Sequence, residues 1–181
     1  MAKTIKMSLS TESIDSALRE LEAYQRDFER KCDLLRERVA AEIRLKAEKN
    51  YDMALGESIA SKVKGSQYYN FSHIDVDVRV ENGKDLSLVI ASGEEVVFVE
   101  FGAGVTFNGA AGSSPHPVGE ELNMLIGEYG KKQGRKKAWA FKGEDGRSYV
   151  TFGTPASQSL YNAVVEVAEN LQRIAREVFN D

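Results

Sequence analysis

The sequence predicts an α+β fold, in which a long N-terminal helix and a C-terminal helix pack on an antiparallel β-sheet made of a meander and a hairpin. Three observations predict it. Apolar residues recur every three or four positions near both ends, they alternate with polar residues in the middle, and a long glycine-rich loop interrupts the alternating region. With 181 residues, the chain is expected to form a single domain, residues 1–181. Its parts are a helical region at about 11–64, a β-sheet region with the loop at about 74–152, and a C-terminal helix at about 155–179.

The N-terminal helix is predicted to begin at Ser10, Thr11 and Ser13, which are good N-cap residues. A short edge strand over residues 3–10 precedes it. Apolar side chains then recur at spacings of three, four or seven and form one stripe: Ile14, Leu18, Leu21, Phe28, Cys32, Leu35 and Val39. The pattern runs to about Lys49 and continues more weakly to Gly65, with Gly56 as a weak point.

This stripe can either seed a coiled coil or cover the chain's own sheet. Three polar residues, Gln25, Glu42 and Lys46, interrupt the a and d positions of the heptad series. We therefore expect the N-terminal half of the helix to pack on the sheet and the rest to be free to meet a neighbouring molecule. Cys32 is expected to be a small buried apolar residue, and as the single cysteine it excludes an intrachain disulfide.

The middle of the chain changes to a period of two from Ile74 onward, which is typical of a half-buried strand. Asn82-Gly83 is a tight-turn signal that leads into a second strand over residues 86–91. Ser92-Gly93 then turns the chain into a third strand over residues 96–101. The three strands are expected to form an antiparallel meander.

A long loop from Gly102 to Glu120 follows, with five glycines, two prolines and two serines but no apolar period. Loops of this length usually serve a function, so it is the best candidate for a functional segment. Residues 137–141 and 148–152 predict a further hairpin around the turn residues 143–146, which is expected to extend the same sheet.

The C-terminal helix has the clearest pattern in the chain. Thr154 can cap it, and Pro155 suits its first position. Its apolar residues form a continuous stripe: Leu160, Val164, Val167, Leu171, Ile174 and Val178. Both helical regions are expected to pack on one face of the sheet.

The composition limits the classes of function. The formal net charge of −4 disfavours a surface that attracts nucleic acid as a whole, so any DNA contact would have to be local. No apolar run is long enough for a transmembrane helix or a signal core, and the protein is therefore expected to be cytosolic when made. One cysteine leaves too few thiolates for a structural zinc site.

Candidates for chemistry are few. A nucleophile with a histidine base would need His73 or His116, and the preferred interpretation of His116 is a surface histidine in a turn. A small hydrolase built on His116 with Ser113 or Ser114 is the weakest alternative. Asp75 and Asp77 share a strand face and could bind a cation, although such residues are usually the solvated side of a strand. No dinucleotide or phosphate-loop motif occurs, so we expect no enzyme activity, no cofactor and no metal.

A basic run at residues 131–137 carries five positive charges, on Lys131, Lys132, Arg135, Lys136 and Lys137. It could contact a phosphate backbone or an acidic protein partner. A solvated connecting loop is the more common meaning of such a run. A small nucleic-acid-binding module that uses residues 131–137 is therefore the alternative function.

Five sequence features carry a resemblance to a known family. Val99-Glu100-Phe101-Gly102-Ala103-Gly104 is similar to the Glu-Phe-Gly-Thr-Gly signature of the HK97 gp10-like family of tailed-phage head-tail joining and tail-completion proteins, with alanine at 103 in place of threonine. The loop with residues 114–117, the hairpin with Trp139, and residues 153–163 follow in the order in which the family presents them. Residues 13–24 also resemble the start of family members, so the resemblance covers nearly the whole chain.

The resemblance implies a minor structural protein of the virion neck without enzymatic activity. It implies a homo-oligomeric ring, with a hexamer expected from tail symmetry, between connector or stopper proteins on one side and the tail tube or tail terminator on the other. Phage DNA would pass through the lumen without sequence-specific binding, and no membrane would be involved. The expected localisation is the virion neck, and the host cytoplasm during assembly. We expect the loop from Gly102 to Glu120 to reach a neighbouring subunit or the tail tube.

Overall fold

A computed structural model of the chain describes residues 8–60, 76–93, 96–102, 116–119, 121–122, 139–142, 146, 148–151 and 156–180. The described elements are α1 (Thr11–Ala60), β1 (Asp77–Asn82), β2 (Ser87–Ser92), α2 (Val96–Phe101), β3 (Trp139–Lys142), β4 (Ser148–Thr151) and α3 (Ser159–Asn180). Long helices at both ends of the chain and antiparallel strand pairs between them confirm the α+β class. Within the described residues, no helix has the length and apolar character needed to cross a membrane.

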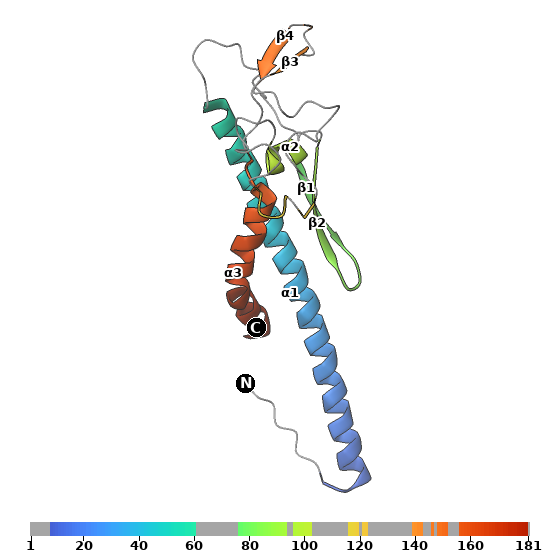
Figure 1. The fold of residues 1–181 in the computed structure, drawn as a ribbon. Coiled ribbons are helices and arrows are strands. Elements are labelled where there is room, and N and C mark those ends of the chain that lie inside the picture. The colour runs from blue at the N-terminus through green and yellow to red at the C-terminus, as the bar shows by residue number, and fades with distance from the viewer. Residues whose placement is uncertain are drawn as a thin grey trace.

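Helix α1 is the axis of the molecule (Figure 1). Its 50 residues form one continuous helix about 75 Å long, and Gly56 does not interrupt it. Ser10 begins the helix as predicted: its carbonyl accepts from the N–H of Ile14 at 3.0 Å, and its hydroxyl accepts from the N–H of Ser13 at 3.3 Å. The strand predicted over residues 3–10 lies almost entirely outside the described residues.

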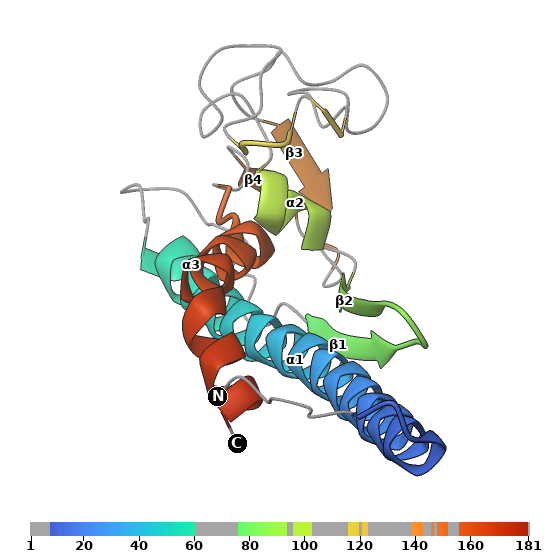
Figure 2. The same ribbon diagram turned by 90° about the horizontal axis from the view of Figure 1, so that it is seen from below.

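The β1–β2 hairpin and α3 lie on either side of α1 (Figures 1 and 2). β1 pairs antiparallel with β2 as predicted, with Asn82 opposite Ser87, and the N–H of Gly83 closes the turn on the carbonyl of Leu86 at 2.7 Å. Helix α3 was predicted to pack on the sheet. It packs against α1 instead. A two-stranded sheet is too narrow to cover two helices, so α3 uses a second face of α1 instead.

The predicted third strand, Val96–Phe101, is wrong: these residues form the short helix α2. Valine-rich runs favour strands, but a strand points neighbouring side chains to opposite faces. Here the adjacent residues Val99 and Glu100 are both buried. Val99 enters the core while Glu100 reaches the start of α3, and a helical turn allows both.

The core is small and joins four elements. Its buried members are Ala47 and Tyr51 of α1, Val78 of β1, Val99 of α2 and Ala163 of α3. Small residues on α1 and α3 let the two helices approach closely, and the hairpin contributes one buried valine. The core therefore lies near the C-terminal half of α1.

The second hairpin forms as predicted, with β3 antiparallel to β4. It does not extend the first sheet, because the described strands make two separate two-stranded sheets. The rest of the β-region that would connect them, including most of the loop from 102 to 120, lies outside the described residues.

Candidate interaction surface

The N-terminal part of α1 projects beyond the rest of the described structure (Figure 1). Helix α3 runs antiparallel to α1, and its last turn meets α1 where the rings of Phe28 and Phe179 lie 5.7 Å apart. On the other side, the β1–β2 turn ends at Arg36, whose guanidinium donates to the carbonyls of Lys84 and Gly83. No other described helix or strand lies beside α1 before these points. We call residues 11–27 the projecting half.

The projecting half carries large apolar side chains in water. Leu18 and Leu21 are 52% and 51% exposed, and Phe28, directly after this half, is 49% exposed. Tyr24 is similarly exposed beside them. The prediction that this half of the helix packs on the chain's own sheet is wrong, because the hairpin reaches only as far as Arg36.

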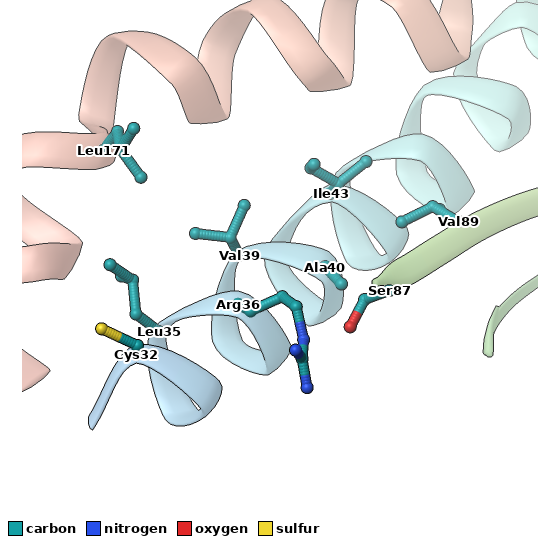
Figure 3. A pocket seen from close by; sticks show the side chains of 9 residues that line it. All are labelled: Cys32, Leu35, Arg36, Val39, Ala40, Ile43, Ser87, Val89 and Leu171. Atoms are coloured by element: carbon teal, nitrogen blue, oxygen red, sulfur yellow. The ribbon is translucent and has the colours of Figure 1, made fainter. Parts of the chain in front are cut away.

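An apolar groove continues the same face of α1 toward the core (Figure 3). Its volume is about 330 Å3, and we call it the trough. The floor is α1, one wall is β2 and the other wall is α3. Its lining residues are Cys32, Leu35, Arg36, Val39, Ala40, Ile43, Ser87, Val89 and Leu171. Cys32 is exposed at the trough, not buried as predicted.

The stripe on the projecting half and the floor of the trough form one surface. Residues 14, 18, 21, 25, 28, 32, 35 and 39 follow each other at alternating spacings of four and three, which keeps them on one helix face. Gln25 is the only polar residue in this series. The apolar surface therefore extends over more than seven helical turns, about 38 Å.

Ion pairs hold the α3 wall of the trough in place on its far side. Lys46 pairs with Glu166, and Arg38 pairs with Glu177. Arg173 also bonds Glu177, and this hydrogen bond is the main cause of the lowered pKa of the Glu177 carboxyl. The side of α3 that faces the trough is instead uncharged, with Val164, Ala168, Leu171 and Ala175 on it.

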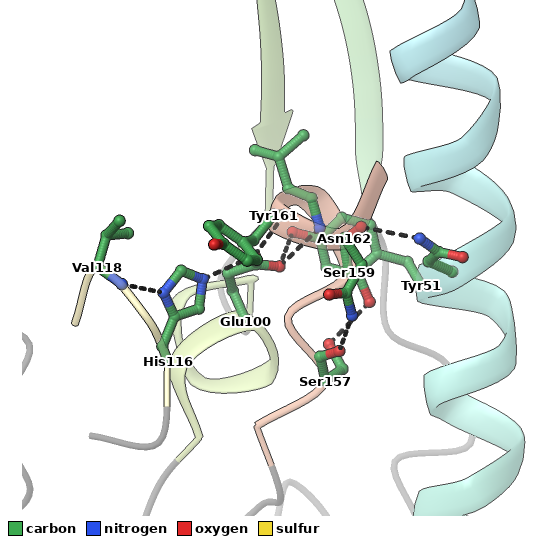
Figure 4. A network of polar contacts seen from close by, with 10 residues as sticks. Tyr51, Glu100, His116, Val118, Ser157, Ser159, Tyr161 and Asn162 are labelled. Carbon is green, nitrogen blue, oxygen red and sulfur yellow. Dashed lines mark hydrogen bonds and ion pairs between the residues drawn. The ribbon is translucent and has the colours of Figure 1, made fainter. Parts of the chain in front are cut away.

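A buried polar network joins α1, α2 and α3 at the other end of the trough (Figure 4). Its centre is Glu100, which is 5% exposed. The Oε2 atom accepts from the Tyr51 hydroxyl at 2.9 Å and from the backbone N–H of Leu160 at 2.9 Å. The Oε1 atom accepts from the N–H of Tyr161 at 3.0 Å. Glu100 thus caps the N-terminus of α3 from a different helix.

The same network explains why α3 begins at Ser159 and not at the predicted Pro155. The N–H groups of Ser157 and Gln158 donate to the carbonyls of Val99 and Glu100, at 2.8 and 3.2 Å. These residues are therefore held in a non-helical link, and Gln158 lies in the left-handed region with a φ of 54°. The helix can start only after this link, where Glu100 replaces the predicted Thr154 cap. Thr154 and Pro155 themselves lie outside the described residues.

His116 belongs to this network and is 4% exposed, so its interpretation as a surface histidine is wrong. The N–H of Val118 donates to its Nδ1 at 3.2 Å, which places the ring proton on Nε2, 3.2 Å from Oε1 of Glu100. Its ring contacts those of Phe101 and Tyr161, at 4.4 and 5.2 Å between centroids. Both ring nitrogens are engaged in holding the fold.

Burial in this network changes the pKa of Tyr51. Desolvation, together with the neighbouring negative charge of Glu100 and the hydrogen bond to it, raises the pKa of the Tyr51 hydroxyl far above its usual value. The phenol therefore stays protonated and keeps donating to Glu100. The network is a structural fastening in which each polar group has a partner.

Other sequence candidates lie partly or wholly outside the described residues. His73, Asp75, Ser113, Ser114 and the basic run 131–137 are among them. Asp77 lies on the exposed face of β1 beside Arg79, at 3.6 Å, as expected for a solvated strand face. Over the described residues, no three acidic, histidine or cysteine side chains gather in a way that could hold a metal ion.

Comparison of the chain with protein-family models, with curated proteins and with solved structures found no match. The functional argument therefore depends on the geometry of the surface and the network. Sequence reasoning found the stripe but placed its exposed part at the wrong end. It missed Glu100 as a cap, for which the sequence carries one signal: an acidic residue within an otherwise apolar run.

Proposed function

We propose that this chain is a structural subunit of a tailed bacteriophage or prophage, and that it forms a ring at the head-tail junction by binding copies of itself and neighbouring virion proteins. The observation that carries this proposal is the apolar surface of α1, which extends over the projecting half and the open trough and leaves Leu18, Leu21 and Phe28 about half exposed. Apolar surfaces of this extent on soluble proteins are typical of contacts with other proteins.

The polar network supports an assembly role over a catalytic one. Glu100 and His116 are buried and bonded to one another, and their remaining polar contacts go to the backbone or to Tyr51. A catalytic base needs access to a substrate, and these side chains are 5% and 4% exposed. We therefore propose no enzymatic activity.

The sequence resemblance supports the location. The Glu-Phe-Gly part of the signature, Glu100-Phe101-Gly102, coincides with the end of α2 and with the residue that fastens three helices together. A subunit that must present two surfaces in fixed orientation to its neighbours needs such a rigid junction. In the proposed ring of six, connector or stopper proteins bind on one side and the tail tube or terminator on the other, and a net charge of −4 disfavours adhesion of the DNA that passes through.

The proposal is tested on particles. The gene is deleted from a phage or prophage that carries it, together with a complemented control, and particles are purified by density gradient. We expect the wild-type chain in mature particles at about six copies, and separate heads and tails from the deletion strain. Absence of the chain from purified particles, or full infectivity of the deletion strain, would overturn the proposal.

A further inference from the structure

The uncovered surface of α1 has two unlike halves. No other described helix or strand lies beside the projecting half, where Leu18 and Leu21 are about half exposed and Ala17 is buried. The half that forms the trough has α3 on one side and β2 on the other (Figures 1 and 3). We propose that in the free protein a second copy of this chain covers this surface, with the two α1 helices antiparallel and the projecting half of each copy lying in the trough of the other. This inference concerns the purified chain and does not depend on a role in a virion.

The walls of the trough determine the direction of pairing. Two parallel α1 helices in register would bring the α3 and β2 walls of one copy against those of the other, and would leave both projecting halves in contact only with each other. An antiparallel pair brings each bare half against a walled half. Only this arrangement fills both troughs with a helix of matching apolar character.

The heptad series determines the register. Antiparallel helices pair a positions with d positions of the partner helix. When residue numbers of opposed positions add to 53, every trough position of the series meets a residue of the projecting half. The layers, each present twice, are Ile14 with Val39, Leu18 with Leu35, Leu21 with Cys32, and Gln25 with Phe28. The helices overlap over residues 14–39, about 39 Å.

The charges beside these layers favour the same register. Along one edge the numbers of opposed flanking residues add to 51, two less than in the layers, so Asp15 of each copy lies opposite Arg36 of the other. Arg36 pairs with Asp33 of its own chain at 3.1 Å, and its Nε atom is buried without a hydrogen-bond partner among the described residues. Tyr24 lies opposite Lys31, where a ring can meet an ammonium group. Glu22 opposite Glu29 is unfavourable.

Shifting the pair by one heptad makes the charges worse. When the numbers of the apolar layers add to 46, those of the flanking pairs on the Asp15 edge add to 44. Asp15 then faces Glu29, and Glu22 faces Glu22 of the other copy, so no attractive pair remains along that edge. When the layer numbers add to 60, Lys46 and Glu42 enter the apolar layers opposite Ile14 and Leu18. Of the three registers, the one in which layer numbers add to 53 therefore keeps the layers apolar and gives the most favourable charge pairs along the Asp15 edge.

The edge of the stripe also disfavours a membrane as the occupant. Asp15, Glu22 and Glu29 lie along one side of the apolar face. Helices that lie on membrane surfaces carry lysine and arginine there, because the lipid headgroups are often anionic. The α1 helix of a second copy, which carries Arg36 along the same edge, complements this acidic row better than a membrane does.

The first test is the mass of the purified full-length chain, by light scattering after size exclusion across a concentration series. We expect twice the chain mass of 20.1 kDa. Leu21→Glu should weaken the pair about a hundred-fold, since each pair loses two buried leucines. Leu34→Glu is the matched control: Leu34 is 47% exposed on the opposite face of α1, and its replacement should leave the mass unchanged.

The second test is cross-linking under oxidising conditions, which reports the register and does not need a destabilised variant. Leu21→Cys should cross-link through Cys32 of the second copy, because the two positions share a layer. Wild-type protein should not cross-link, since the two Cys32 residues are about 16 Å apart along the pair. Ile14→Cys should not cross-link either, because it meets Cys32 only in the register at 46.

Several results would overturn the proposal. A mass of one chain at all concentrations up to about 100 μM would do so, as would a mass near six chains. If the Leu21→Glu variant still has twice the chain mass, the two copies associate through another surface. Efficient cross-linking of Ile14→Cys or of the wild type would exclude this register, and so would the absence of cross-linking in Leu21→Cys. None of these outcomes bears on whether the chain is present in virions.

Discussion

Replacing Glu100 by glutamine tests whether the polar network holds the three helices together. The carboxylate accepts four hydrogen bonds, from Tyr51, His116 and the N–H groups of Leu160 and Tyr161. Glutamine has the same shape but one carbonyl oxygen, so at least two buried donors would face its NH2 group. It also removes the negative charge at the N-terminus of α3.

The magnitude follows from the lost bonds. A hydrogen bond to a charged group contributes about 1.5–3 kcal/mol, so losing two of them lowers the free energy of unfolding by about 3–6 kcal/mol. Single domains are stable by only about 5–15 kcal/mol. Glu100→Gln should therefore shift the urea midpoint strongly, and Tyr51→Phe, which removes one bond to the carboxylate, should cost about 1.5–3 kcal/mol.

The assay is urea unfolding followed by far-ultraviolet circular dichroism, together with amide hydrogen exchange. In Glu100→Gln, the amides of Leu160 and Tyr161 should lose protection more than the amide of Ile174, which lies deep in α3. Glu169→Gln, an exposed change on the same helix, should leave the midpoint unchanged. If Glu100→Gln stays within about 1 kcal/mol of the wild type and keeps those amides protected, the network does not fasten the helices.

Further predictions concern pH, packing and the hairpin. Because burial beside Glu100 raises its pKa above the usual value of about 10, the hydroxyl of Tyr51 contributes stability that is present below pH 10 and is lost as pH rises above it. In absorbance titrations near 295 nm, native Tyr51→Phe and wild type should therefore show equal phenolate amplitude around pH 10, and a larger wild-type amplitude would contradict the burial. Ala163→Leu should destabilise by about 1–3 kcal/mol in urea unfolding, since Ala163 is fully buried between α1 and α3, whereas Ala168→Leu at an exposed position should not. Arg36→Met removes the bonds to the β1–β2 turn and should speed hydrogen exchange at Gly83 without slowing or speeding it in α3; equal effects on both would show global destabilisation instead.

Local pattern predicted most of the fold. The stripe of α1, the alternation in β1 and the Asn82-Gly83 turn each depend on neighbouring residues, and all three form as expected. The Val96–Phe101 segment failed because its strand propensity is overridden by contacts with residues 157–161, far away in sequence. No local pattern contains that information.

The surface was predicted less well than the elements. Periodicity identifies the apolar face of α1 but does not say which part of it other elements cover. Coverage depends on the lengths of the partners: α3 has 22 residues against 50 in α1, and it lies against the C-terminal part of α1, so it ends at Phe28. The same limit applies to His116, whose burial is set by Glu100, Phe101 and Tyr161 rather than by its proline neighbours.

The backbone bonds between residues 99–100 and residues 157–158 have a consequence for how the chain can be altered. Glu100 and Gln158 are therefore fastened to each other, and between them in sequence His116 is bonded to the same junction through Glu100. Everything between them is topologically an insertion with its ends already joined. Doubling the length of such a segment costs about 0.6 kcal/mol in closure entropy. A protein engineer could therefore exchange the segment after His116 for another hairpin or a small tag and leave the α1–α3 body intact, and natural variants would have the same freedom.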